Sequence, residues 1–143
     1  MEYIEVDPLT VLYSQCCIKP KFKNGKLVEE TIMKLVNGEI TPRDIETITV
    51  YTLPNGKTHS LDNRRLYAFK QAIMRGSNFR TVIVIRSSTA NDLQKLEKKM
   101  KNPPSRDWSV VEVKNDCKPI SNSTHALFYF LENILRTTYG ESE

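Results

Sequence analysis

The chain has 143 residues, of which 39% are hydrophobic and 27% are charged, and its 21 Lys and Arg outnumber its 17 Asp and Glu. A chain of this length normally forms one domain around one core. The composition excludes a disordered, collagen-like or disulfide-stapled miniature protein. No apolar run approaches the roughly 18 residues that span a bilayer, which argues against a membrane protein.

The N-terminal residues and the cysteines both favour a soluble, cytoplasmic protein, or a nuclear one if the source is a eukaryote. Residues 1–8 lack the basic head and apolar block of a signal peptide. The three cysteines, Cys16, Cys17 and Cys117, form no Cys-x-x-Cys pair and have no histidine at zinc-ligand spacing. We therefore expect reduced thiols, no metal site and no membrane partner.

The positive charges gather in three clusters along the chain. A net charge of +4 is modest, and solvated surface side chains are its ordinary explanation. The distribution is more informative than the sum, because each cluster is a candidate contact for a polyanion. The clusters are Lys19, Lys21, Lys23 and Lys26, then Arg64 and Arg65, and finally Lys95, Lys98, Lys99 and Lys101.

The first third of the chain predicts a strand, an irregular segment and a helix. Residues 3–6 alternate weakly, as a short strand does. Residues 9–25 show no clean period and end in a turn signal that contains Gly25. From Leu27 the apolar residues fall on one helical face, and Asn37-Gly38 is typical of a helix end.

The middle of the chain predicts a β-hairpin followed by a helix. Residues 45–52 are rich in β-branched side chains, residues 54–57 form a turn, and residues 58–61 are a short returning strand. Asp62-Asn63 then stands at a helix start, and the helix ends near Gly76.

The last part predicts two strands and two helices. Residues 81–85 are almost continuously apolar, which predicts a strand covered on both faces. A helix over Leu93, Leu96 and Met100 precedes a strand at 108–113, and a final helix begins at Ser123. The alternation of helices and short strands predicts a compact α+β domain over residues 1–139, with a small mixed sheet flanked by helices and a loose tail at 140–143.

The most informative local feature is the junction between the hairpin and the helix that follows it. Backbone N–H groups at a helix start are unpaired and the helix dipole is positive there, so phosphate binds at such positions. Arg64 and Arg65 would add planar donors to these amides. The alternative is that the arginines pair with nearby carboxylates such as Asp44 or Glu46.

This junction resembles the phosphate-binding motif of the ParB/sulfiredoxin superfamily. The similar stretch is residues 61–72, LDNRRLYAFKQA, where ParB-type proteins have Gly-Glu-Arg-Arg before the helix and sulfiredoxins have Gly-Cys-His-Arg. Upstream, Val6-Asp7-Pro8, Ser14-Gln15, Phe22 and Gly25 are similar to the ParB-like domains of bacterial polymorphic toxins. The resemblance covers residues 6–74, and it implies a ParB/sulfiredoxin-like fold.

The resemblance assigns roles to the residues of the motif. It implies that Arg65 and Arg64 hold the phosphates of a nucleotide. Asn63 falls where ParB has a glutamate linked to CTP turnover and where sulfiredoxins have their catalytic cysteine. Because Asn63 is neither, the resemblance does not extend to sulfiredoxin-type reduction, and it leaves ParB-style hydrolysis without its glutamate.

Several other residues are candidates for the same site, each with an ordinary structural alternative. Ser14, Gln15 and Lys19 would line the phosphate pocket, or else occupy a turn and a solvated loop. His59 is a candidate general base, or a polar strand residue facing solvent. Asp62 would bind Mg²⁺ beside substrate phosphates, or cap the helix.

Two functions follow from these candidates. The first is an enzyme, a nuclease or a phosphotransferase, that acts on a nucleotide or nucleic acid, with Asn63, His59 and Asp62 as catalytic candidates and Mg²⁺ as a candidate cofactor. The second is a non-catalytic module that senses a nucleotide or binds the nucleic-acid backbone. In both, Arg64 and Arg65 hold phosphate. The alternative to both is an interaction domain that inherited the fold and lost the ligand.

Overall fold

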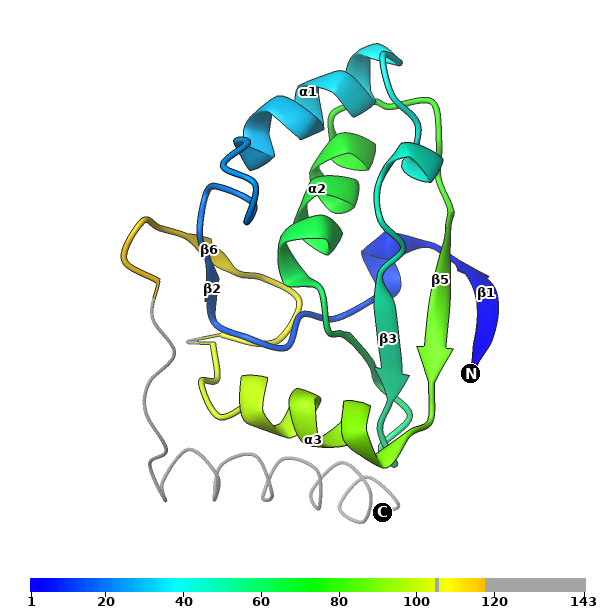
Figure 1. The fold of residues 1–143 in the computed structure, drawn as a ribbon, viewed down its shortest axis with the longest axis vertical. Coiled ribbons are helices and arrows are strands. Elements are labelled where there is room, and N and C mark those ends of the chain that lie inside the picture. Colours follow the sequence, from blue (N-terminus) through cyan, green and yellow to red (C-terminus); the bar gives the residue numbers. More distant parts are fainter. Residues whose placement is uncertain (105, 118–143) are drawn as a thin grey trace.

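The computed structural model describes residues 1–104 and 106–117, and these residues form an α+β domain (Figure 1). The described part contains a four-stranded mixed sheet, a two-stranded sheet, three α-helices and two 3₁₀ turns. In chain order they are β1 (Glu2–Val6), η1 (Pro8–Thr10), β2 (Cys17–Ile18), α1 (Val28–Asn37), η2 (Pro42–Asp44), β3 (Thr49–Thr52), β4 (Thr58–Ser60), α2 (Asn63–Met74), β5 (Val82–Ser87), α3 (Ala90–Lys99) and β6 (Glu112–Val113).

The main sheet has the strand order β1-β5-β3-β4 and is mixed, as the sequence predicts. β1 runs antiparallel to β5, β5 runs parallel to β3, and β3 and β4 form the antiparallel hairpin. Val50 lies opposite Ser60 in this hairpin. Gly56 has a φ of 82°, which only glycine adopts without strain, and it closes the turn by donating to the carbonyl of Leu53.

The core lies between one face of this sheet and the pair of helices α1 and α2. Figure 1 shows the two helices side by side on the same side of the sheet, with α3 across the end of β3 and β5. A smaller apolar cluster lies under α3, where Leu96 and Met100 pack against Leu53 and Leu61. The main core contains Val28, Ile32 and Leu35 of α1, Leu66, Phe69 and Ala72 of α2, and Val50, Val82 and Val84 of the sheet.

The helix boundaries follow the signals in the sequence. Gly38 ends α1 in the left-handed conformation, with a φ of 78°, and its N–H donates to the carbonyls of Lys34 and Leu35. α3 begins after Thr89, whose hydroxyl accepts a hydrogen bond from the N–H of Asp92. Burial on one face and the caps at the ends therefore explain both helices.

Two strand predictions are corrected by the structure. β5 is covered on one face only, because the side chain of Ile83 is 53% exposed while Val82 and Val84 are buried. A continuous apolar run does not distinguish these two cases. The segment 108–113 is a strand only at β6, and the predicted helix from Ser123 and the tail at 140–143 lie outside the described residues.

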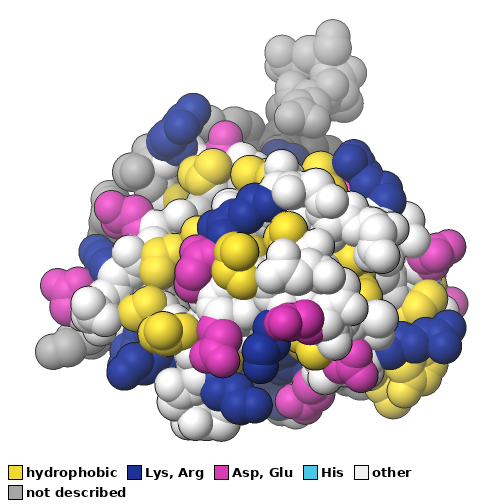
Figure 2. Space-filling model, turned by 90° about the horizontal axis from the view of Figure 1, so that it is seen from above, with side chains coloured by type: hydrophobic (Ala, Val, Ile, Leu, Met, Phe, Trp, Pro, Cys, Tyr) yellow, Lys and Arg dark blue, Asp and Glu magenta, His cyan; other side chains and the backbone are white. Residues whose placement is uncertain are grey.

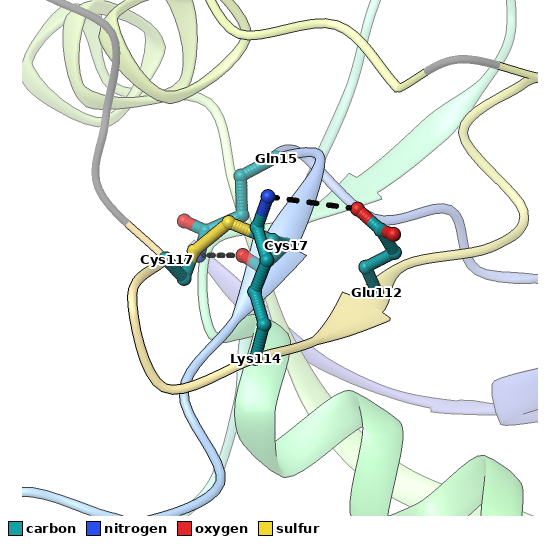
Figure 3. Close-up of a disulfide and its surroundings, with 5 residues drawn as sticks. All are labelled: Gln15, Cys17, Glu112, Lys114 and Cys117. Atoms are coloured by element: carbon teal, nitrogen blue, oxygen red, sulfur yellow. Dashed lines mark hydrogen bonds and ion pairs between the residues drawn. A yellow bond between two sulfur atoms is a disulfide. The ribbon is translucent and has the colours of Figure 1, made fainter.

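The second sheet is a short parallel pair, β2 and β6, joined by a disulfide bond next to it (Figure 3). Cys17 of β2 bonds to Cys117, 100 residues later in the chain, with a distance of 5.7 Å between the Cα atoms. The expectation of reduced thiols is therefore wrong for this pair, although Cys16 is a free thiol. A separation of this size leaves no local pattern in the sequence, which is why the pairing was missed.

Reduction of this disulfide is expected to lower the free energy of unfolding by up to about 5 kcal/mol, because the bond closes a loop of about 100 residues in the unfolded chain. Thermal unfolding followed by circular dichroism, with and without a phosphine reductant, measures the effect. Cys17→Ser should reproduce it. Cys16→Ser is the matched control and should melt like the wild type. If the oxidised wild type, the reduced wild type and Cys17→Ser all melt at the same temperature, the disulfide does not stabilise the fold.

Candidate anion-binding site

The described part of the chain has a cavity of about 830 Å³ that we call the basic pocket. Its walls come from four places: β2 with the segment after it, the start of α2, the last turns of α3, and Cys117 beside the disulfide. Apolar and neutral lining is provided by Phe22, Gln15 and the cysteines. Among the described residues, Asn102 and seven cationic side chains also line it, the cations being Lys19, Lys21, Lys23, Arg64, Lys95, Lys98 and Lys99.

The charge in the basic pocket is of one sign, because no Asp or Glu is among the described residues that line it. Lys99 reports this electrostatic environment. Burial lowers its pKa, the charge of Asp62 opposes that change, and the charges of Arg64, Lys23 and Lys95 lower the pKa further. Members of all three basic clusters of the sequence therefore lie close together in the basic pocket, where their charges repel one another.

Outside the basic pocket, one face of the molecule carries charges of both signs (Figure 2). On the face seen in Figure 2, above the upper ends of α1 and α2, basic and acidic side chains are intermixed. Pairs such as Lys34 with Glu30 and Arg75 with Glu29 balance their charges. The modest net charge of the whole chain thus conceals a local concentration of positive charge.

Arg64 lies at the junction between α2 and the segment after β2. Its Nη1 donates to the carbonyl oxygen of Lys21 at 2.7 Å, which joins two of the pocket walls. A guanidinium has five N–H donors, so this bond orients the group and leaves donors to face the cavity. Of the two arginines predicted to hold phosphate, Arg64 is the one that lies among other cations in the basic pocket.

Arg65 points to a different place. Its Nη1 donates to the carbonyl oxygens of Glu46 at 2.9 Å and Thr47 at 3.0 Å, and its Nη2 donates to Oδ1 of Asp62 at 2.7 Å. Arg65 is also absent from the described lining of the basic pocket. The prediction that Arg64 and Arg65 converge on one oxyanion is therefore corrected: the alternative of pairing with neighbours such as Glu46 describes Arg65.

Asp62 supports the fold with both of its carboxylate oxygens. Oδ2 accepts the N–H of Thr49 at 2.7 Å and Oδ1 accepts Arg65, and the side chain does not cap α2. Within residues 1–104 and 106–117, no three His, Cys, Asp or Glu side chains lie together. The contacts of Asp62 assign it to the connection between β3 and α2, and its role as a Mg²⁺ ligand beside substrate phosphates stays a prediction.

Asn63 and Ser14 form a buried polar link. The backbone N–H of Ser14 donates to Oδ1 of Asn63 at 2.8 Å, and Nδ2 of Asn63 donates to Oγ of Ser14 at 2.9 Å. Oγ of Ser14 in turn donates to the carbonyl of Ser60 at 2.5 Å. Asn63 is only 4% exposed and Ser14 is fully buried. The structure therefore brings these two candidates together, and their hydrogen bonds connect the residues next to Gln15 and Arg64, which line the pocket.

His59 is buried on the inner side of the hairpin. It is 1% exposed, and its Nδ1 lies 2.7 Å from the carbonyl oxygen of Tyr13. A carbonyl only accepts, so Nδ1 carries the proton. Its ring meets Trp108 edge-on at 5.7 Å between centroids. Burial lowers the pKa of His59, and neither role considered from the sequence, a base at the phosphate or a residue facing solvent, describes this position.

Gln15 and Lys19 do line the basic pocket. Nε2 of Gln15 donates to the carbonyl of Cys17 at 2.7 Å, which holds its side chain beside the disulfide (Figure 3). The residues that the site prediction missed are Phe22 and the α3 lysines. The lysines were visible in the sequence as the third basic cluster, but nothing in the sequence showed that α3 lies next to the start of α2.

Comparison with known proteins adds no relative. No family model matches the chain, and no curated protein sequence or solved structure matches it either. No helix within the described ranges is long and apolar enough to cross a membrane.

Loss of the buried link between Asn63 and Ser14 is expected to destabilise the protein. Asn63→Ala leaves the buried N–H of Ser14 without its acceptor, which costs about 1–3 kcal/mol. Urea unfolding measures this cost. Asn91→Ala, at an exposed asparagine of α3, is the matched control and should change stability by less than about 0.5 kcal/mol. Equal stability of Asn63→Ala and wild type would contradict the role of the link.

His59 is expected to make the protein less stable in mild acid. Its pKa is lower in the folded protein than the ordinary 6.5, so the unfolded chain takes up the proton more readily. The contribution is complete above pH 6.5 and is lost as the pH falls below it. Urea unfolding between pH 7.5 and about 5, above the ordinary pKa of carboxyl groups, should show this decline. His59→Gln should flatten it, and an unchanged slope in that variant would place the titration elsewhere.

Proposed function

We propose that this protein is a phosphate-binding module that holds a nucleotide or a nucleic acid in the basic pocket. The observation that carries the proposal is the lining of that pocket: seven cations from three separate segments and no described carboxylate. Repelling charges of this kind destabilise a fold unless a ligand neutralises them. Phosphate groups, with their several oxygen acceptors, are the ligands that lysine and arginine bind best.

The resemblance to the ParB/sulfiredoxin superfamily supports the same proposal. Arg64 stands at the second phosphate-binding position of that motif and lines the pocket. Gln15 and Phe22, which belong to the upstream part of the resemblance, line it too, as does the neighbouring Lys19. A ParB/sulfiredoxin-like fold is thus part of the proposal, with Arg64 as the phosphate contact and Arg65 as the residue that fixes the helix start.

The geometry favours binding over catalysis. Proton transfer to or from a reacting phosphate needs a positioned acid or base, and the three catalytic candidates are held elsewhere: Asn63 by Ser14, His59 by the carbonyl of Tyr13, and Asp62 by Arg65 and Thr49. The alternative, a nuclease or phosphotransferase, would have to use other groups.

Inorganic tripolyphosphate and ATP are expected to bind and to raise the melting temperature. Arg64→Ala and Lys98→Ala should each weaken binding about tenfold, because each removes a charged donor to phosphate. Isothermal titration calorimetry at low salt gives the affinities. Arg43→Ala, which removes the same charge from η2 outside the basic pocket, is the matched control and should bind like the wild type.

Two outcomes would contradict the proposal. If neither tripolyphosphate, ATP nor any oligonucleotide binds, the pocket is not a phosphate site. If ATP, plasmid DNA or total RNA is turned over in the presence of Mg²⁺, and the product disappears in Arg64→Ala, the protein is an enzyme and the alternative replaces the binding module.

A further inference from the structure

We infer that the ligand of the basic pocket is a single strand of nucleic acid, held along several consecutive phosphates with an unpaired base against Phe22. This rests on the proposed function and narrows it to one class of ligand. Three features carry the inference: the arrangement of the cations in two rows, their number, and the place of one aromatic ring among them.

The first row of cations follows the chain after β2. Lys19, Lys21 and Lys23 all line the basic pocket, and residues two apart in a chain lie up to about 7 Å from each other. Lys21 is in extended pairing with Leu27, which fixes this segment as one wall. Its charges therefore form a line along the wall.

The second row is on α3. Lys95, Lys98 and Lys99 line the same pocket, and their spacing of three and four residues puts them on one face of the helix, over about 6 Å of its length. Arg64 stands between the rows, bonded to the carbonyl of Lys21. The pocket therefore has lysines on two of its walls.

The number and spread of the charges favour a linear polyanion. A nucleoside triphosphate concentrates its charge at one end of the molecule and neutralises the cations nearest to it. A nucleic-acid strand carries one charge per nucleotide and distributes these charges along its backbone. Six lysines on two walls, with Arg64 between them, match the second distribution, as in proteins whose positively charged grooves follow a single strand.

Phe22 is the reason to expect a single strand. Its ring is partly buried, packs on the main core and lines the pocket among the lysines of the first row. A base stacks on such a ring only when it is unpaired, because the bases of a duplex are stacked on each other. A cationic wall that carries an aromatic ring therefore favours single-stranded over double-stranded nucleic acid.

Fluorescence anisotropy with labelled oligo-dT and oligo-U of two to twelve nucleotides tests the inference on the full chain. The affinity should rise with length over the first several nucleotides and then level off, and it should exceed the affinities for tripolyphosphate, ATP and a duplex of the same length. The logarithm of the binding constant should fall linearly with the logarithm of the salt concentration, with a slope of about −0.7 for each phosphate contacted.

Two variants separate the contributions of charge and stacking. Lys98→Ala should make the salt slope shallower by about 0.7, and Arg43→Ala should leave it unchanged. Phe22→Leu keeps an apolar side chain at the edge of the core and should weaken oligonucleotide binding about tenfold, without changing the affinity for tripolyphosphate. A melting temperature like that of the wild type shows that this variant is folded.

The failures of the two proposals are distinguishable. If tripolyphosphate or ATP binds as tightly as the longest oligonucleotide and length has no effect, the single-strand inference is wrong and the phosphate-binding function stands. Duplex binding equal to single-strand binding, or an unchanged affinity in Phe22→Leu, also overturns the inference. If no phosphate compound binds, both are wrong.

Discussion

The buried link between Ser14 and Asn63 is the constraint on which the pocket depends. Ser14 stands five residues before Lys19, the start of the first row of lysines, and Asn63 is the residue before Arg64. Their mutual hydrogen bonds, and the bond from Ser14 to the carbonyl of Ser60, fix the relative positions of the segment, the hairpin and α2. Since an unpaired polar group in this buried place would cost more than the bond itself gains, the arrangement has few alternatives.

Specific contacts within the fold partly offset the repulsion between the cations of the basic pocket. Lys98 and Lys99 lie in the last turn of α3, where the partial negative charge of the helix end favours them. Arg64 is bonded to a backbone carbonyl. Asp62 lowers the repulsion felt by Lys99 without entering the pocket. Burial and the repulsion that remains lower the pKa of Lys99, and an anion that entered the pocket would counteract the repulsion.

Most of the fold was predictable because its signals are local. The hairpin at 49–60, the end of α1 at Gly38 and the amphipathic pattern of α3 each depend on residues within one turn or one strand of each other. The parallel pair of β2 and β6 and the bond between Cys17 and Cys117 depend on residues about 100 positions apart, and no periodicity records such a contact. The two faces of β5 were indistinguishable for a related reason, since burial of Ile83 would be decided by what packs on the sheet and not by the strand itself.

The site was half predictable, and the reason lies in helix geometry. Successive residues of an α-helix point about 100° apart, so the side chains of Arg64 and Arg65 leave α2 in different directions. Both arginines lie in the first turn of α2, but of the two only Arg64 lines the basic pocket. Arg65 donates to the carbonyls of Glu46 and Thr47 and to the carboxylate of Asp62. Arg64 instead lines the basic pocket, together with the lysines of α3. The two adjacent arginines therefore have different roles: Arg65 stabilises the start of the helix, and Arg64 is one cation of the basic pocket.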